Sequence, residues 1–200
     1  MKIIFLDIDG VLNSNEWASR RFEETSMDSI ASSYPFYEFD PLLVKNLNKI
    51  IDKTGAKVVV SSTWRLGRTK EELQEILNGV GFTGEVIDVT PYMPSPLGFG
   101  YDVPRGCEID WWLEQNGGFH RINWSLEEFT RYVEKAKIKN YVILDDDSDM
   151  LYNQREHFVL TSFMDGLSEY CVDKAISILN TPVQKLYYPN YVSNSRLSLK

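Results

Sequence analysis

Cysteine and histidine are scarce in this sequence of 200 residues, which contains two of each. The cysteines, Cys107 and Cys171, stand far apart and outside any metal-ligand spacing, so neither a disulfide framework nor a cysteine-bound metal is expected. Two reduced thiols are typical of a reducing compartment, which favours a cytoplasmic location.

Long hydrophobic runs are also lacking. No apolar stretch approaches the roughly 20 residues that a membrane-spanning helix needs. The first residues, MKIIFLDIDG, place acids where the apolar part of a signal peptide would continue. We therefore expect neither an export signal nor a membrane partner.

Positive charge is in deficit, because 21 Lys and Arg stand against 29 Asp and Glu and the formal net charge is −8. A protein without a basic field is not expected to bind a polynucleotide along an extended surface. Any phosphate group must therefore be bound by a few residues at a local site.

The chain does contain an alternation of short apolar strands and amphipathic helices. Strands that are apolar throughout and separated by helices predict an α/β fold, in which helices cover both faces of a parallel sheet of about five strands. The expected strands are Lys2–Leu6, Ala56–Val60, Glu85–Val89, Tyr141–Leu144 and His157–Leu160. The expected helices lie between Pro41 and Gly55 and over Thr69–Asn78, Arg105–Gln115, Leu126–Lys137 and Glu169–Leu179.

Polar side chains stand directly after three of these strands. Right-handed crossovers place the carboxyl ends of parallel strands along one edge of a sheet, where such folds bind ligands. We therefore expect these side chains to meet, although long stretches of sequence separate them. They are Asp7 and Asp9, Ser61 and Ser62, and Asp145 and Asp146.

So many acids in one place require a cation. Hard oxygen ligands suit Mg²⁺, which proteins hold through few carboxylates together with substrate phosphate. An EF-hand calcium loop is excluded, because the string DIDG has no third oxygen ligand before its Gly and no Glu follows at the required place. The predicted ligands of Mg²⁺ are Asp7, Asp9, Asp145 and Asp146.

The same residues are suited to phosphoryl transfer. A carboxylate beside Mg²⁺ can attack phosphorus, and an acid two residues on can protonate the leaving oxygen and then deprotonate a water molecule. In extended backbone Asp7 and Asp9 would face one site. Ser61 can donate a hydrogen bond to the transferred group, and a fixed cation is needed to neutralise its charge.

Three segments, LDIDGVLN, VVVSSTWR and VILDDDSDM, with RGCEI and WL between the last two, carry a resemblance to a known family. They resemble the haloacid dehalogenase (HAD) superfamily, and most closely the HAD domain of Swiss Army Knife RNA repair proteins, over about residues 2 to 170. The resemblance implies a Rossmann-like HAD fold, with Asp7 as nucleophile and Asp9 as acid and base. It also implies Ser61, with Ser62 as the fallback, as a phosphate ligand. An Asp at the position of Asp9 is typical of phosphatases in the superfamily.

The resemblance further implies a basic residue at a helix start ahead of the acidic strand. Arg105 fits by position and charge, whereas Lys137 and Lys139 lie nearer Asp145 in the sequence and stay as alternatives. Arg65 is expected to add a second phosphate contact, as an Arg close after the same strand does in polynucleotide phosphatases of the superfamily.

The resemblance implies a phosphatase domain over residues 1–180 and a tail over 181–200, with small insertions at about 13–39, 90–104 and 117–138 and no large cap domain. The expected activity is Mg²⁺-dependent hydrolysis of a phosphomonoester through an aspartyl-phosphate. A nucleotide or a nucleic-acid end is favoured slightly over other phosphorylated small molecules. The alternative is a HAD-like binding or regulatory module without turnover.

Overall fold

The computed structural model describes residues 1–24, 39–94, 103–118 and 125–187. They form one five-stranded sheet of order β3-β2-β1-β4-β5, in which every neighbouring pair runs parallel. The central strand β1 therefore lies between β2 and β4, and the carboxyl ends of all three share one edge. The strands are β1 (Lys2–Leu6), β2 (Lys57–Val60), β3 (Val86–Val89), β4 (Asn140–Asp145) and β5 (Phe158–Leu160).

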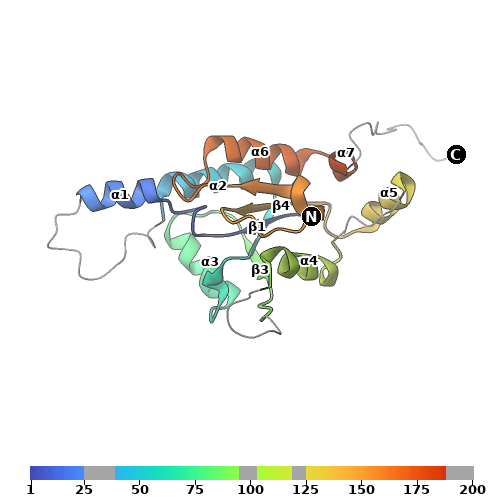
Figure 1. The fold of residues 1–200 in the computed structure, drawn as a ribbon, viewed down its shortest axis with the longest axis horizontal. Coiled ribbons are helices and arrows are strands. Elements are labelled where there is room, and N and C mark those ends of the chain that lie inside the picture. The colour runs from blue at the N-terminus through green and yellow to red at the C-terminus, as the bar shows by residue number, and fades with distance from the viewer. Residues whose placement is uncertain (25–38, 95–102, 119–124, 188–200) are drawn as a thin grey trace.

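Helices cover both faces of this sheet (Figure 1). Helices α2, α3 and α6 contribute to the core on one face, and α4, α5 and α7 to the core on the other. Helix α1 comes from the chain after β1 and extends away from the sheet (Figure 1). The helices are α1 (Asn15–Glu24), α2 (Pro41–Thr54), α3 (Lys70–Gly79), α4 (Arg105–Gln115), α5 (Leu126–Lys135), α6 (Glu169–Asn180) and α7 (Val183–Tyr187), with two short 3-10 helices, η3 (Thr63–Arg65) and η4 (Tyr152–His157).

Successive residues of a strand point to opposite faces, and the two cores follow this alternation. In β1, Ile4 and Leu6 belong to the core under α2, α3 and α6. Ile3 and Phe5 belong to the core under α4, α5 and α7. Both sets are fully buried, which is why the strands are apolar throughout and why the sequence predicted a sheet covered on both faces.

The predicted α/β fold is confirmed, and the predicted helix ends rest on local chemistry that the structure contains. Asp40 accepts a hydrogen bond from the N–H of Leu42 at the start of α2, and Gly55 adopts a left-handed conformation at its end. Ser125 and Glu128 form the predicted capping box of α5. Because caps of this kind depend on residues two to four apart, a single sequence is enough to locate them.

Helices α1 and α7 were not predicted. Helix α7 lies beyond residue 180, yet Val183 and Tyr187 are buried. The Tyr187 ring packs edge-on against Phe129 at 5.4 Å, and its hydroxyl lies 2.9 Å from Nε2 of His157. Burial lowers the pKa of His157 to about 4, so its imidazole is neutral near pH 7 and serves packing. These contacts join α7 to the folded domain.

Parts of the three predicted insertions, residues 25–38, 95–102 and 119–124, lie outside the described residues, as does the end of the tail from residue 188. Both cysteines are free, with Cys171 buried and Cys107 half-buried. In the part of the chain that the structure describes, no helix has the length and apolar character needed to cross a membrane.

Candidate active site

The side-chain alternation of the strands also places the polar residues that follow them. Side chains two residues apart lie on the same face of a strand. When the first of them faces α4 near the end of its strand, the second lies on the same side at the carboxyl edge of the sheet. The strand pairing continues this far, because the N–H of Asp7 donates to Leu144 O at 3.0 Å and that of Ser61 to Leu6 O at 2.9 Å. The pairs of successive residues on the α4 face are Phe5 and Asp7, Val59 and Ser61, and Ile143 and Asp145.

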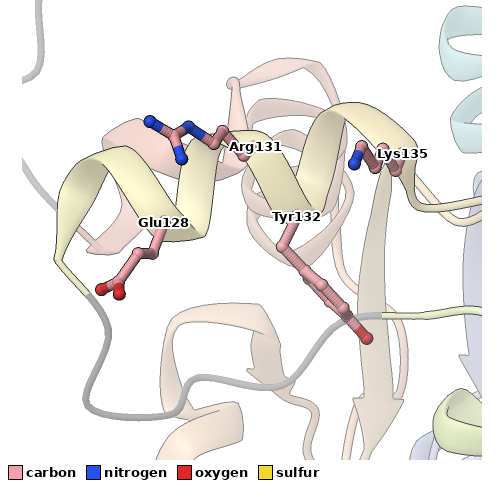
Figure 2. A pocket seen from close by; sticks show the side chains of 4 residues that line it. All are labelled: Glu128, Arg131, Tyr132 and Lys135. Atoms are coloured by element: carbon pink, nitrogen blue, oxygen red, sulfur yellow. The ribbon is translucent and has the colours of Figure 1, made fainter.

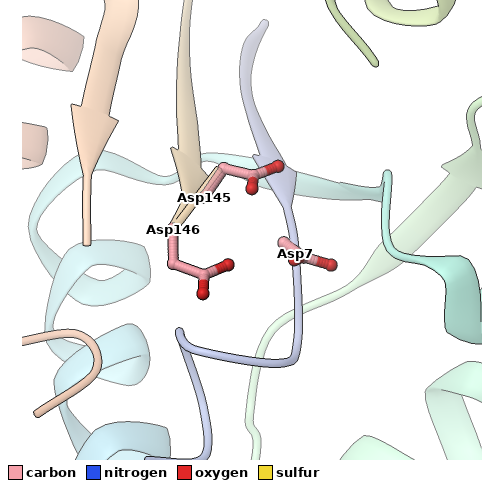
Figure 3. A group of neighbouring side chains, drawn as sticks. All are labelled: Asp7, Asp145 and Asp146. Atoms are coloured by element: carbon pink, nitrogen blue, oxygen red, sulfur yellow. The ribbon is translucent and has the colours of Figure 1, made fainter. Parts of the chain in front are cut away.

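Three carboxylates meet at this edge: Asp7 at the end of β1 and Asp145 and Asp146 at the end of β4 (Figure 3). One oxygen of each lies within 4.8 Å of the other two. Asp7 and Asp145 are buried, so water screens their repulsion poorly. Burial and the neighbouring Asp7 raise the pKa of Asp145 to about 7 and also raise that of Asp146. A hard divalent cation fits this set of oxygen donors, because its charge would offset both the burial and the mutual repulsion that raise these pKa values.

The guanidinium of Arg105, the first residue of α4, lies against the same acids. Its Nη1 is 2.9 Å from Oδ1 of Asp7 and 3.0 Å from Oδ2 of Asp145. The two carboxylates raise the pKa of Arg105 despite its burial, so the side chain stays charged. Of the basic residues that the sequence left as alternatives, Arg105 is the one that the structure places beside the acids.

Contacts with the chain after β4 hold the start of helix α4 in place. The backbone N–H of Arg105 donates to Oδ2 of Asp149 at 2.7 Å. Nε2 of Gln154 donates to Gly106 O at 2.8 Å, and a Cβ on Gly106 would lie only 2.5 Å from the backbone nitrogen of Leu151. The loop after β4 thus fixes the start of the helix that carries Arg105. Asp149, whose role the sequence left open, takes part here and is not in the group of three carboxylates.

Arg65 has a structural environment that contradicts the predicted phosphate contact. Its guanidinium is buried and donates hydrogen bonds through every N–H group it has. One acceptor is Oε2 of Glu108 on α4, at 2.5 Å. The others are the carbonyl oxygens of Ser61, Ser62, Thr90 and Pro91. Arg65 therefore ties the ends of β2 and β3 to α4 and has no donor left for a substrate.

The two serines differ in the use of their hydroxyl groups. Ser62 caps η3, where its Oγ accepts the N–H of Trp64 at 3.3 Å. The Ser61 hydroxyl is fully buried and has no hydrogen-bond partner among the described residues. An unpaired buried hydroxyl costs roughly 1–3 kcal/mol, which a ligand oxygen would recover. Ser61, rather than Ser62, is therefore the residue suited to bind a phosphoryl group.

Asp9 lies near this edge, but its carboxylate is outside the group of three. The extended backbone ends at Asp7, because the N–H groups of Val11 and Leu12 both donate to Ile8 O in a turn. This turn replaces the extended backbone on which the predicted common orientation of Asp7 and Asp9 was based. Instead, the Asp9 oxygens accept hydrogen bonds from Asn13 and Trp64, and the prediction of Asp9 as a carboxylate ligand of the metal gains no support.

Lys139 was predicted as a phosphate ligand, and the structure contradicts this. It immediately precedes β4, whereas Asp145 ends that strand, so the two lie at opposite edges of the sheet. Its ammonium donates to the carbonyl oxygens of Val133 and Glu134 at the end of α5. The main chain of Lys137 is also far from the acids, because its carbonyl accepts a hydrogen bond from the N-terminus of the chain. Lys139 and Asp145 are close in the sequence, but they lie at the two ends of β4 and are therefore apart in space.

Gly10 is a residue that the motif contains but that sequence reasoning did not single out. Its φ is +67°, and a Cβ there would lie 2.3 Å from Cγ of Asp146. We expect Gly10→Ala to destabilise the protein by about 1–3 kcal/mol more than Gly55→Ala, which meets the same left-handed strain without a clash. Gly55 is a matched control, since its φ is +64° and nothing lies within 4 Å. Urea denaturation of both variants measures the difference, and equal losses would contradict the close approach.

A second prediction concerns the pH dependence of stability without metal. The pKa of Asp145 in the fold, about 7, is above its ordinary value of 3.8. The native state therefore binds this proton more tightly than the unfolded state. Protonation of Asp145 therefore stabilises the native state fully below about pH 4, and this stabilisation is lost as the pH rises to about 7.

In EDTA, the free energy of unfolding of Asp145→Asn should therefore increase relative to that of the wild type as the pH rises from about 5 to about 8. The opposite contribution of His157, whose pKa is lowered by burial, is common to both proteins and cancels. Urea denaturation across this range measures the gap. A gap that stays constant with pH would contradict the raised pKa of Asp145.

A shallow hollow elsewhere on the surface is unrelated to the acids. Glu128, Arg131, Tyr132 and Lys135, all from α5, line it (Figure 2). These side chains come from a single amphipathic helix on the face of the sheet away from α2 and α6, and none of the predicted site residues is among them.

A parallel α/β sheet in which buried carboxylates stand at the ends of the neighbouring strands β1 and β4, faced by an arginine from a helix start, is the arrangement expected of a HAD-like hydrolase. The family model for the HAD domain in Swiss Army Knife RNA repair proteins matches residues 3–126, which is more than half of the chain. The chain belongs to this family. Membership indicates a hydrolase of the phosphatase type. No curated protein and no solved structure gives a significant match.

The matched residues include Asp7, Ser61 and Arg105 but end before β4. Asp145 and Asp146 are joined to the site by the fold, through the pairing of β4 with β1. The family match thus covers Asp7, Ser61 and Arg105, and the geometry brings the two acids of β4 to the same edge.

Proposed function

We propose that this protein is a Mg²⁺-dependent phosphatase that hydrolyses a phosphomonoester through an aspartyl-phosphate on Asp7. One observation carries the proposal: Asp7, Asp145 and Asp146 gather at the carboxyl edge of the sheet, with the Arg105 guanidinium in contact with two of them. The unpaired Ser61 hydroxyl, at the end of the neighbouring strand, adds a donor for a phosphoryl oxygen.

Asp7, Asp145 and Asp146 would hold the metal ion. Bound Mg²⁺ would neutralise negative charge on the phosphoryl group and on the crowded carboxylates. Arg105 and Ser61 supply fixed donors from two other elements of the fold. Phosphoryl transfer depends mostly on positioning and charge neutralisation, so this set of groups is suited to it.

In the proposed reaction an oxygen of the Asp7 carboxylate forms a bond to phosphorus while the bond from phosphorus to the leaving oxygen breaks. The leaving oxygen takes a proton from Asp9, which becomes a carboxylate. Asp9 then accepts a proton from a water molecule as the oxygen of that water forms a bond to phosphorus and the bond from phosphorus to the Asp7 oxygen breaks. Inorganic phosphate leaves, and both Asp7 and the protonated Asp9 are regenerated.

For the substrate we propose the terminal phosphate of a nucleotide or of a nucleic acid, ahead of other phosphorylated small molecules. The link of the family to RNA repair proteins supports this choice. The net charge of −8 argues against extended contacts along a polynucleotide, so recognition is assigned to the end that carries the phosphate. A cytoplasmic location, inferred from the two free thiols, is part of the same proposal.

The function is tested by measuring phosphate release from an aryl phosphate with Mg²⁺ and after adding EDTA. We expect turnover with Mg²⁺, none in EDTA, and recovery when Mg²⁺ is restored in excess. A panel of nucleotides and of oligonucleotides phosphorylated at the 3′ or 5′ end then ranks substrates by kcat/KM. Activity that survives EDTA would contradict the metal dependence. Binding of phosphate compounds without any turnover would favour the binding module instead.

A further inference from the structure

The Asp9 carboxylate is held by two side chains that have no role in the proposed reaction. Nδ2 of Asn13 donates to Oδ1 at 2.8 Å, and Nε1 of Trp64 donates to Oδ2 at 2.9 Å. Within the described residues each oxygen thus accepts one hydrogen bond, and each keeps a second acceptor position. The carboxylate is fixed in orientation while one position on each oxygen stays open to a proton or a substrate.

Both donors are themselves fixed. Oδ1 of Asn13 accepts the N–H of Gly10 at 2.9 Å, so the amide nitrogen must be the end that faces Asp9. Trp64 is the second residue of η3, two residues after the cap Ser62, and Phe39 packs edge-on against its ring at 5.3 Å. Trp64 therefore connects the chain after β2, where Ser61 lies, to the acid in the turn after β1.

We propose that Trp64, with Asn13, is a positioning residue that sets Asp9 for protonation of the leaving oxygen. This inference rests on the proposed function, in which Asp9 is the acid. Asp9 lies in the turn after β1, directly before Gly10, and without these hydrogen bonds its carboxylate would rotate about its side-chain bonds. The indole is a donor with a single direction and no acceptor, so it fixes that rotation without competing for the proton.

The test compares substrates that differ in their need for the acid. An alkyl phosphate has a basic leaving oxygen that must be protonated, whereas 2,4-dinitrophenyl phosphate has a leaving group that departs without a proton. The quantity measured is kcat/KM, which covers the steps up to departure of the leaving group. It is independent of the later hydrolysis of the aspartyl-phosphate.

Trp64→Phe keeps an aromatic ring beside Phe39 but removes the N–H donor together with the five-membered ring of the indole, a loss that the control variant below shares. We expect its kcat/KM for the alkyl phosphate to fall by about tenfold or more, against about twofold or less for the dinitrophenyl phosphate. Asp9→Asn should show the same selectivity with a larger effect. Trp64→Phe in the Asp9→Asn background should cost nothing further for the alkyl phosphate, because the indole acts through Asp9.

Trp112→Phe is the matched control. Its Nε1 donates to Oδ2 of Asp88 at 2.7 Å, so the variant loses the same kind of hydrogen bond away from the three carboxylates. We expect it to leave the ratio of the two kcat/KM values unchanged. In the spectrum of 15N-labelled protein, Asp9→Ala should shift the Nε1–H resonance of Trp64 and not that of Trp112, which tests the contact without altering either tryptophan.

The outcomes distinguish a failure of the positioning role of Trp64 from a failure of the proposed phosphatase function. If Asp9→Asn is selective for the alkyl phosphate but Trp64→Phe lowers both substrates equally or neither, the positioning role is wrong and the proposed function stands. A Trp64 resonance that ignores Asp9→Ala would also overturn the positioning role. If the wild type hydrolyses neither substrate with Mg²⁺, the proposed function fails, and the positioning role fails with it.

Discussion

Asp7→Asn should abolish phosphate release while the fold is retained. We expect kcat to fall by about 10³-fold or more, because the amide cannot form the covalent intermediate and the other groups cannot replace it. The exchange of one oxygen for nitrogen keeps the shape of a buried side chain and removes one of three crowded charges. Phosphate release with Mg²⁺ measures activity, and circular dichroism with thermal unfolding measures the fold.

Asp147→Asn is the matched control for this experiment. It lies in the same run of acids and loses the same charge, but its side chain is exposed and is not in the group of three carboxylates. Its backbone N–H, which donates to Oδ1 of Asp145, is unchanged by the substitution. We expect activity close to that of the wild type. Full activity in Asp7→Asn would make the assignment of the nucleophile wrong.

Arg65→Ala should cause the largest loss of stability among single charge deletions in this domain. The substitution leaves the buried carboxylate of Glu108 without its cation and removes the donor from four carbonyl oxygens. Removing one partner of a buried ion pair typically costs about 3–5 kcal/mol. The free energy of unfolding, from urea denaturation, measures the effect.

Lys57→Ala provides the comparison at the surface. Lys57 pairs with Glu85 between β2 and the start of β3, but both side chains are exposed. Solvent screens such a pair, and its loss should cost about 1 kcal/mol or less. Similar losses in the two variants would mean that Arg65 is not a buried structural cation. Arg65→Lys should fall between them, because an ammonium cannot reach acceptors on three segments at once.

The carboxylates show how much of a site a sequence can define by itself. Each strand is a short apolar run, and polar residues placed directly after such runs must lie at the carboxyl edge of a parallel sheet. Asp7, Ser61 and Asp145 were therefore predicted to come together, and the structure brings them to one edge. The prediction succeeded because it depended only on strand ends and on topology.

The roles of the basic residues could not be predicted in this way. Arg65 follows Ser61 closely in the sequence, yet the carbonyl oxygens around it consume all of its donors. Lys139 is only six positions from Asp145, yet a full strand lies between them. Long side chains reach in directions set by the packing of helices against the sheet, and a single sequence does not contain that packing.

Local chemistry in the sequence determined the apolar strands, the capped helices and the acids that follow β1 and β4, because each depends on residues close together in the chain. The tertiary structure decided that Arg105, rather than Lys137 or Lys139, is the cation beside the acids, and it alone decided that Arg65 and Glu108 bind each other and that Trp64 holds Asp9. These three contacts join residues 40, 43 and 55 positions apart, so they exist only after the helices and loops have packed around the sheet.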